Sequence, residues 1–125
     1  MSLKIPPQYL PVMPYLILDK AQDFLTFSKE VFDASEQMVV PSDGDIMHGE
    51  IRIQDAVIMF ASATPEWKQR NSSMYLYVED VKKVYRKALT NSAISLQEPV
   101  QKEYGFTAGF EDPFGHLDVE HRAFG

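Results

Sequence analysis

Apolar and polar positions follow two different periods along the chain, and the same succession of periods occurs twice. Residues 12–19 and 72–79 are short apolar runs rich in leucine, valine, isoleucine and aromatic residues, as expected of buried strands. Each run leads into apolar positions at helical spacing, with Asp19 and Asp80 placed to cap the two helices. Because the second set repeats the first at an offset of sixty residues, we predict an internal duplication.

Three strand-like stretches follow each predicted helix. In the first half they lie at 36–40, 46–53 and 56–61, and in the second half at 93–97, 106–111 and 116–121. Each half therefore reads strand, helix and three strands. The sequence predicts an α+β fold made of paired βαβββ modules, at 12–62 and 72–122, within one domain that spans 1–125.

Composition narrows the function classes. The chain has no cysteine, which excludes disulfides, thiol catalysis and cysteine-based metal sites. With a net charge of −6 and a pI near 4.9, it lacks the basic patch of a nucleic-acid-binding protein. No apolar run reaches the length of a membrane span, and the start does not resemble a secretory signal. We therefore expect a cytoplasmic protein with neither nucleic-acid nor membrane partners.

Four motifs in this order resemble the vicinal oxygen chelate superfamily, and its glyoxalase/bleomycin-resistance branch most of all. They are Pro14-Tyr15-Leu16, the run from His48 to Ile53, the run from Tyr75 to Val81, and Asp112-Pro113-Phe114-Gly115-His116. The resemblance implies a curved mixed sheet around a cavity, helices on the outer face and a homodimer. It also implies, in many members, a divalent metal held by His and Glu ligands.

The metal ligands that the resemblance implies are missing here. Their positions, one on the first and one on the last strand of each module, fall on Met13, Met59, Ser73 and Val119. Two thioethers, a hydroxyl and an isopropyl group do not make a magnesium, manganese, iron or zinc site. We therefore expect no metal cofactor, and no other cofactor.

Polar residues alternate with apolar ones along 46–53. Met47, Gly49, Ile51 and Ile53 are expected to face the first helix, which turns His48, Glu50 and Arg52 towards the cavity. His48 and Glu50 can act together as acid and base, and Arg52 can orient an anionic group or pair with Glu50. The alternative is a structural ion pair beside a hydrogen-bonded histidine.

Three tyrosines have the same strand parity as these polar residues. Tyr15, Tyr75 and Tyr77 would give the cavity a flat apolar wall with polar tips, which suits an aromatic ligand. Packing in the core or at a dimer interface is the alternative. Trp67, in the linker 64–71, is expected to cap the cavity mouth or anchor a subunit contact.

The last two strands conflict with the offset of sixty. At that offset Thr107, Glu111, Asp118 and Glu120 would face the second helix, where an unpaired carboxylate is costly. A one-residue slip around the Asp112–Gly115 turn would turn Phe106, Phe110, Leu117 and Val119 to the helix instead. Asp118 and Glu120 would then line the cavity as ligand-binding residues. A solvated strand edge is the alternative.

The leading hypothesis is a metal-independent protein that binds a small aromatic or cationic molecule, as in antibiotic sequestration. Whether it is also an enzyme stays open. The alternative is a lyase, isomerase or dioxygenase relative. It would use His48 and Glu50 together with Glu120 as a rearranged metal site, or His48 and Glu50 alone as a metal-free acid–base pair. A third possibility is an interaction module with a vestigial cavity.

Overall fold

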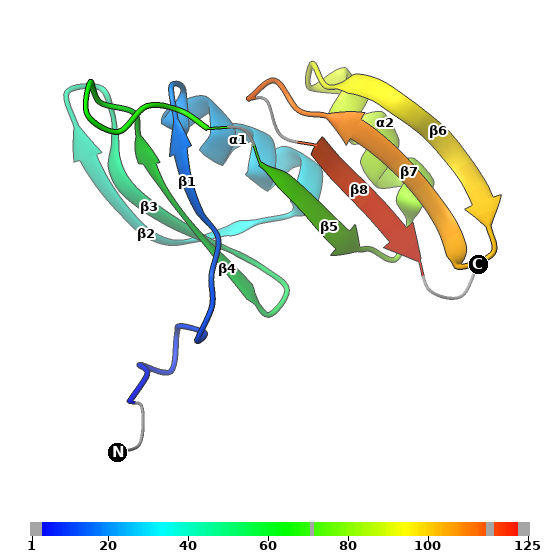
Figure 1. Ribbon diagram of the computed structural model, residues 1–125, viewed down its shortest axis with the longest axis horizontal. Coiled ribbons are helices and arrows are strands. Elements are labelled where there is room, and N and C mark those ends of the chain that lie inside the picture. Colours follow the sequence, from blue (N-terminus) through cyan, green and yellow to red (C-terminus); the bar gives the residue numbers. More distant parts are fainter. Residues whose placement is uncertain (1–3, 71, 115–116, 123–125) are drawn as a thin grey trace. The chain divides into compact units, whose positions relative to one another are not determined.

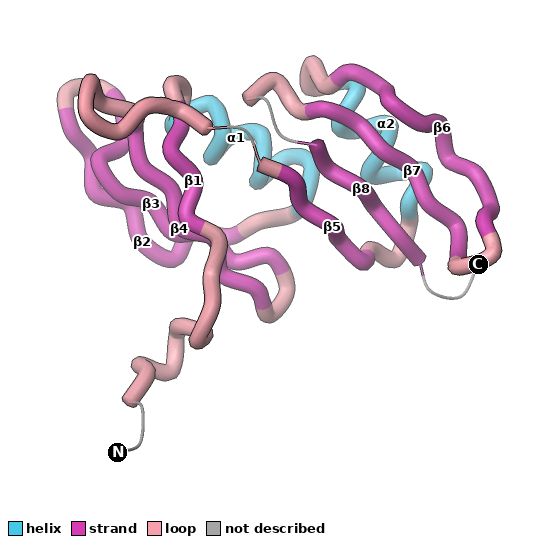
Figure 2. Tube along the Cα trace, viewed as in Figure 1, coloured by secondary structure: helices cyan, strands magenta, loops and turns pink. Residues whose placement is uncertain are grey.

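The computed structural model describes residues 4–70, 72–114 and 117–122, and for 117–122 it describes the backbone alone. The chain forms two compact units, one holding residues 1–29 and 33–69 and the other holding 30–32 and 70–125. Each unit contains one four-stranded sheet, and the strands are visibly curved (Figure 1). Each sheet is built from one strand before a helix and three strands after it (Figure 2).

The first unit runs from β1 to β4. Its elements are β1 (Tyr15–Leu18), α1 (Ala21–Phe32) apart from its last three residues, β2 (Ser35–Ser42), β3 (Asp45–Ile53) and β4 (Ala56–Ser62). The strand order is β1-β4-β3-β2, in which β1 runs parallel to β4 and the other neighbours are antiparallel. The parallel pair is possible because α1 carries the chain back across the sheet.

The second unit repeats this order. Its elements are β5 (Ser73–Tyr77), α2 (Val81–Thr90), β6 (Ile94–Lys102), β7 (Gly105–Glu111) and β8 (Leu117–Arg122). The strand order β5-β8-β7-β6 again has one parallel pair, β5 with β8. The α+β class with paired βαβββ sets and mixed sheets, predicted from the spacing, is therefore confirmed.

The two helices begin differently. Asp80 caps α2 as predicted, because its side chain accepts a hydrogen bond from the backbone N–H of Lys83 at 3.1 Å. Asp19 does not cap α1. Asp45 at the start of β3 does so instead, and its carboxylate accepts from the N–H of Gln22 at 3.0 Å. Spacing along the chain could not predict this cap, since it comes from a strand twenty-three residues further on.

The core of the first unit lies between its sheet and α1. Phe60 is fully buried and meets the edge of Phe24 on the helix, with ring centroids 5.3 Å apart. Gly49 pairs with Phe60 across the sheet, and a Cβ at that position would collide with the Phe60 ring. A glycine is therefore required where this aromatic ring crosses the neighbouring strand.

One residue predicted to face α1 does not. Met47 is 58% exposed, whereas Ile46 beside it is 1% exposed. The register between β2 and β3 passes from Val40–His48 to Pro41–Ile46, so Met47 is an extra residue in the ladder. Such a bulge reverses the alternation of side chains from that point on, which turns Met47 outwards.

The predicted slip in the second unit is correct for β7 alone. Lys82 of α2 lies over the Phe106 ring at 5.7 Å, and Phe110 pairs with Ser95, whose hydroxyl accepts from Tyr85 of α2 at 2.6 Å. Phe106 and Phe110 thus face α2, as predicted. However, the backbone register pairs Phe110 with Asp118 rather than with Leu117 or Val119. One strand has shifted against the other, so the expectation that both shift together is wrong.

Candidate functional site

A polar cluster occupies the face of the first sheet opposite α1, which we call the far face. Phe60 and Gly49 point towards α1, so the alternate residues of β3 and β4 point away from it. Tyr15, Met59 and Glu50 lie side by side on β1, β4 and β3. His48 and Arg52 flank Glu50 along β3, so the far face carries the polar set predicted from the alternation.

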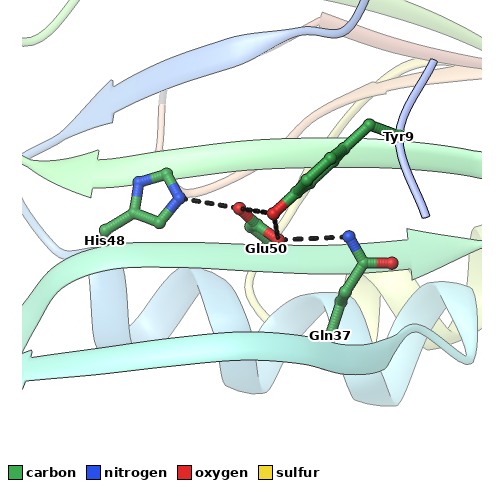
Figure 3. Close-up of polar contacts among 4 residues, drawn as sticks. All are labelled: Tyr9, Gln37, His48 and Glu50. Carbon is green, nitrogen blue, oxygen red and sulfur yellow. Dashed lines mark hydrogen bonds and ion pairs between the residues drawn. The ribbon is translucent and has the colours of Figure 1, made fainter. Parts of the chain in front are cut away.

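Glu50 lies at the centre of this cluster and is only 2% exposed. Its carboxylate accepts from the Tyr9 hydroxyl, 3.0 Å from both oxygens, and from Gln37 Nε2 at 3.1 Å (Figure 3). His48 Nε2 lies 2.9 Å from Glu50 Oε2. A buried carboxylate is stable only when donors replace its lost hydration, and here three side chains do so.

The donors also set the charge of the cluster. Burial raises the pKa of Glu50. The hydrogen bonds from His48, Gln37 and Tyr9 lower it by more than burial raises it, so the net pKa lies below its ordinary value. The hydrogen bond to Glu50 also raises the pKa of Tyr9, because ionising the phenol would lose this bond; burial and the negative charge of Glu50 add to the effect. At neutral pH Glu50 is therefore an anion, and Tyr9 is a neutral donor.

Arg52 extends the network on the far face. Its Nη1 donates to Gln37 Oε1 at 2.8 Å and to the backbone carbonyl of Gln8 at 3.1 Å. Gln37 thereby links the guanidinium to the carboxylate of Glu50. The predicted direct pair between Arg52 and Glu50 is replaced by this bridge, in which the amide donates to one group and accepts from the other.

Gln37 and Tyr9 are site residues that the sequence pattern missed. Gln37 is an extra residue in the β2–β3 ladder, since Glu36 pairs with Ile51 and Met38 with Glu50. This bulge lets Gln37 reach the far face beside Met38, although strict alternation would separate them. Tyr9 lies in the proline-rich segment before β1, where no periodicity indicates a contact with β3.

The predicted aromatic residues fall into separate groups. The Tyr15 ring centroid lies 6.0 Å from that of His48, so Tyr15 borders the polar cluster and is 53% exposed. In the second unit the rings of Tyr75 and Tyr77 lie 5.6 Å apart, both more than half exposed. Burial and the nearby Tyr77 and Tyr104 raise the pKa of Tyr75.

Trp67 lies in the loop after β4 and is 67% exposed. Its backbone N–H donates to the Thr64 hydroxyl at 3.0 Å, which closes a turn. The loop lines a shallow hollow of about 480 Å³, whose other residues include Asp19, Lys68 and Gln69. Neither Trp67 nor any residue of the polar cluster lines this hollow, so the predicted capping role of Trp67 remains a prediction.

The remaining predicted residues lie on β8. The side chains of Asp118 and Glu120 fall outside the described residues. The backbone register pairs these positions with Phe110 and Ala108, so the joint slip on which their assignment to ligand binding depended is not observed, and the assignment stays a prediction without that support. On β7, Thr107 is buried and Glu111 is exposed. The backbone register places Thr107 opposite His121.

The cluster presents a buried anionic acceptor beside a partly accessible imidazole ring. Among residues 4–70 and 72–114, no three His, Asp or Glu side chains converge on one point. Glu50 offers an anionic acceptor, and His48, whose side chain is 27% exposed, offers a partly accessible ring beside it.

Within the same described ranges, no helix has the length and apolar character needed to cross a bilayer.

Comparison with solved structures identifies the fold. TioX from Micromonospora sp. ML1 superposes with a TM-score of 0.75 at 17% identity, covering 89% of this chain and 96% of TioX. A glyoxalase/bleomycin resistance protein/dioxygenase family enzyme from Burkholderia phytofirmans PsJN superposes with a TM-score of 0.69 at 15% identity, covering 87% of this chain and 94% of that enzyme. TnmS3, an antibiotic binding protein from Streptomyces sp. CB03234, superposes with a TM-score of 0.67 at 13% identity, covering 91% of this chain and 97% of TnmS3.

These likenesses extend over most of each chain, so the protein has the glyoxalase/bleomycin-resistance fold that the sequence motifs suggested. No protein-family model matches the sequence, and no curated protein matches it either. At identities of 13–17% the comparisons describe the fold, and the chemistry has to be argued from the side chains.

Proposed function

We propose that this protein binds a small aromatic or cationic molecule on the far face of the first sheet, without a metal ion, as an antibiotic-sequestering protein would. The observation that carries the proposal is the ionised, buried carboxylate of Glu50, which is bordered by the exposed ring of Tyr15. A fixed anion beside an aromatic surface suits a ligand with a protonated amine attached to a ring.

Two further observations support binding without a metal. The positions at which the family resemblance expects ligands hold Met13, Met59 and Ser73 among the described residues, and these donors are poor ligands for hard cations. A solved structure of the same fold, TnmS3, is itself described as an antibiotic binding protein. The fold therefore accommodates sequestration as well as catalysis.

The second candidate is an enzyme that uses His48 and Glu50. It is favoured by one observation, the 2.9 Å contact between His48 Nε2 and Glu50 Oε2, through which the carboxylate can orient a partly exposed imidazole. The lowered pKa of Glu50 makes this carboxylate a weak base, so in such an enzyme His48 would exchange the proton and Glu50 would orient it.

The test is a thermal-shift and calorimetric screen of the full chain with aromatic amines, neutral aromatic analogues and the chlorides of Mn, Ni and Zn. Binding of an aromatic amine that is weakened at least tenfold in Glu50→Gln supports the proposal, since a charge-assisted hydrogen bond is worth about 1.5–3 kcal/mol. Asp55→Asn, at the exposed β3–β4 turn, is the control for an equal change of net charge.

Two results would reject the proposal. One is stoichiometric, tight binding of a divalent ion that is abolished in His48→Ala, which would favour a metalloenzyme. The other is an aromatic amine whose affinity is the same in Glu50→Gln and in Asp55→Asn, since the carboxylate would then have no part in recognition. Turnover of a glyoxal-type substrate that is lost in His48→Ala, with no metal added, would favour the acid–base alternative.

A further inference from the structure

The part of the chain that precedes β1 reaches the same groups that a ligand would use. Residues 4–14, which we call the N-terminal segment, include four prolines and form neither helix nor strand. Tyr9 of this segment places its hydroxyl on both oxygens of Glu50, and the carbonyl of Gln8 accepts from Arg52. Two neighbouring residues thus engage the anionic and the cationic group of the far face.

Apart from these contacts, the end of the segment next to β1 is fixed by the N–H of Met59, which donates to the carbonyl of Pro14 at 3.0 Å. Within the segment, the N–H of Tyr9 donates to the carbonyl of Pro6 at 3.0 Å, and this hydrogen bond closes a turn. Pro7, Gln8 and Val12 are exposed, and Val12 is 87% exposed. Because little apolar surface of the segment is buried, its position on the sheet depends mainly on hydrogen bonds that another molecule could replace.

We propose that Gln8 and Tyr9 act as an internal competitor at the binding site. The inference depends on the proposed function, since it assumes that Glu50 and Arg52 recognise the ligand. The segment then also describes the ligand class: a molecule with a hydrogen-bond donor for Glu50, a carbonyl oxygen for Arg52, and an aromatic ring. A protonated amine displaces the phenol of Tyr9 because a charged donor binds a carboxylate more strongly than a neutral one does.

The competition has a measurable consequence. When the segment occupies the site, only a fraction of the molecules is ready for a ligand, and the apparent affinity falls by that fraction. Removing the Tyr9 hydroxyl takes away the contact with Glu50 and leaves the ring in place. We expect apparent affinity in Tyr9→Phe to increase by up to about tenfold, the factor that corresponds to one neutral-to-charged hydrogen bond.

The probe is L-tyrosinamide, which has an ammonium group, an amide carbonyl and an aromatic ring, used at about pH 6.5, where the amine is protonated. N-acetyl-L-tyrosinamide, which lacks the ammonium, is the neutral comparison. Each probe is titrated into the ¹⁵N-labelled full chain in three forms: the original sequence, Tyr9→Phe and Val12→Ala. Val12→Ala is the matched control, a change in the same segment at an exposed side chain.

The expected result is tighter binding of L-tyrosinamide by Tyr9→Phe, with Val12→Ala unchanged and the acetylated probe weaker throughout. In the original sequence, the amide signals of residues 8–10 and of Val12 should move towards random-coil positions as the probe saturates, because the segment is released. Binding of equal or lower affinity in Tyr9→Phe, with those signals unmoved, overturns the inference and leaves the proposed function standing. Failure of both probes to bind any of the three forms rejects the proposed function, and the competitor with it.

Discussion

Replacing Glu50 by glutamine tests the buried carboxylate most directly. Glutamine keeps the shape of glutamate but removes the charge and turns one acceptor into a donor. The amide N–H₂ would then face at least one of the groups that donate to Glu50, namely Tyr9, Gln37 and His48. The variant loses charge-assisted hydrogen bonds and gains a clash between donors.

The magnitude follows from a balance of two terms. A hydrogen bond to a charged acceptor stabilises the fold by roughly 1 kcal/mol more than a neutral one does, so the three hydrogen bonds to Glu50 add about 3 kcal/mol. Burial of the charge offsets part of this, yet the net pKa of Glu50 is lowered, so the donors outweigh the burial. We expect Glu50→Gln to lose about 1–2 kcal/mol of unfolding free energy, and about 3–10 °C in Tm for a chain of this size.

The assay is urea unfolding followed by circular dichroism over a series of pH values, with Asp55→Asn as the control. Because the folded pKa of Glu50 lies below its unfolded value of about 4.3, its stabilisation is complete above that value and is lost as pH falls through the folded pKa. The difference between the original chain and Glu50→Gln should thus be constant from about pH 7 to 5.5 and shrink below about pH 4.

Two outcomes would refute this reasoning. A loss below about 0.5 kcal/mol at neutral pH, which is the size usual for a surface substitution, would mean that the donors do no more than offset the burial of the charge. A gain in stability would mean that the burial penalty exceeds the hydrogen bonds, as it does for many buried ion pairs.

Three further predictions address the cluster and the fold. Gly49→Ala should destabilise the chain by about 1–3 kcal/mol or more. Gly109→Ala is the control, because its Cβ would lie 3.8 Å from Gln97 Cβ, and it should change the urea midpoint little. Equal midpoints in the two variants would refute the close approach of the Phe60 ring to Gly49. Asp45→Ala should cost about 1 kcal/mol because α1 loses its cap, and the amide exchange of Gln22 should rise; an unchanged rate would contradict that cap. In an NMR pH series, the Tyr9 hydroxyl should titrate above the ordinary tyrosine pKa of about 10, and Glu50→Gln should lower the midpoint of that titration. A Tyr9 midpoint that is the same in Glu50→Gln would exclude the contact between Tyr9 and Glu50.

The sequence predicted the repeating elements well, because amphipathic periodicity directly reflects which face of each element is buried. It also placed His48, Glu50 and Arg52 on one face of β3, since strict alternation holds from Gly49 to Ile53. It failed where a bulge intervenes. Gln37 and Met47 are both extra residues in the β2–β3 ladder, and one extra residue reverses the facing of its neighbours without any change in composition. Tyr9 could not be foreseen, because contacts of an irregular segment follow no period.

The bulges and the slip together change how the two halves should be aligned. Ala108 lies between Phe106 and Phe110, which face α2, and it pairs with Glu120 as Gly49 pairs with Phe60. The structural counterpart of Gly49 is therefore Ala108, at an offset of fifty-nine, although the offset of sixty points to Gly109. It follows that Gly109 is the counterpart of Glu50.

This alignment assigns different chemistry to the two units. Where the first unit holds a buried carboxylate, the second holds a glycine, and Thr107 takes the position of His48. The second unit offers the exposed rings of Tyr75 and Tyr77 instead. Under the proposed function, the buried anion that would recognise a charged group is therefore Glu50 of the first unit, because the corresponding position of the second unit, Gly109, has no side chain.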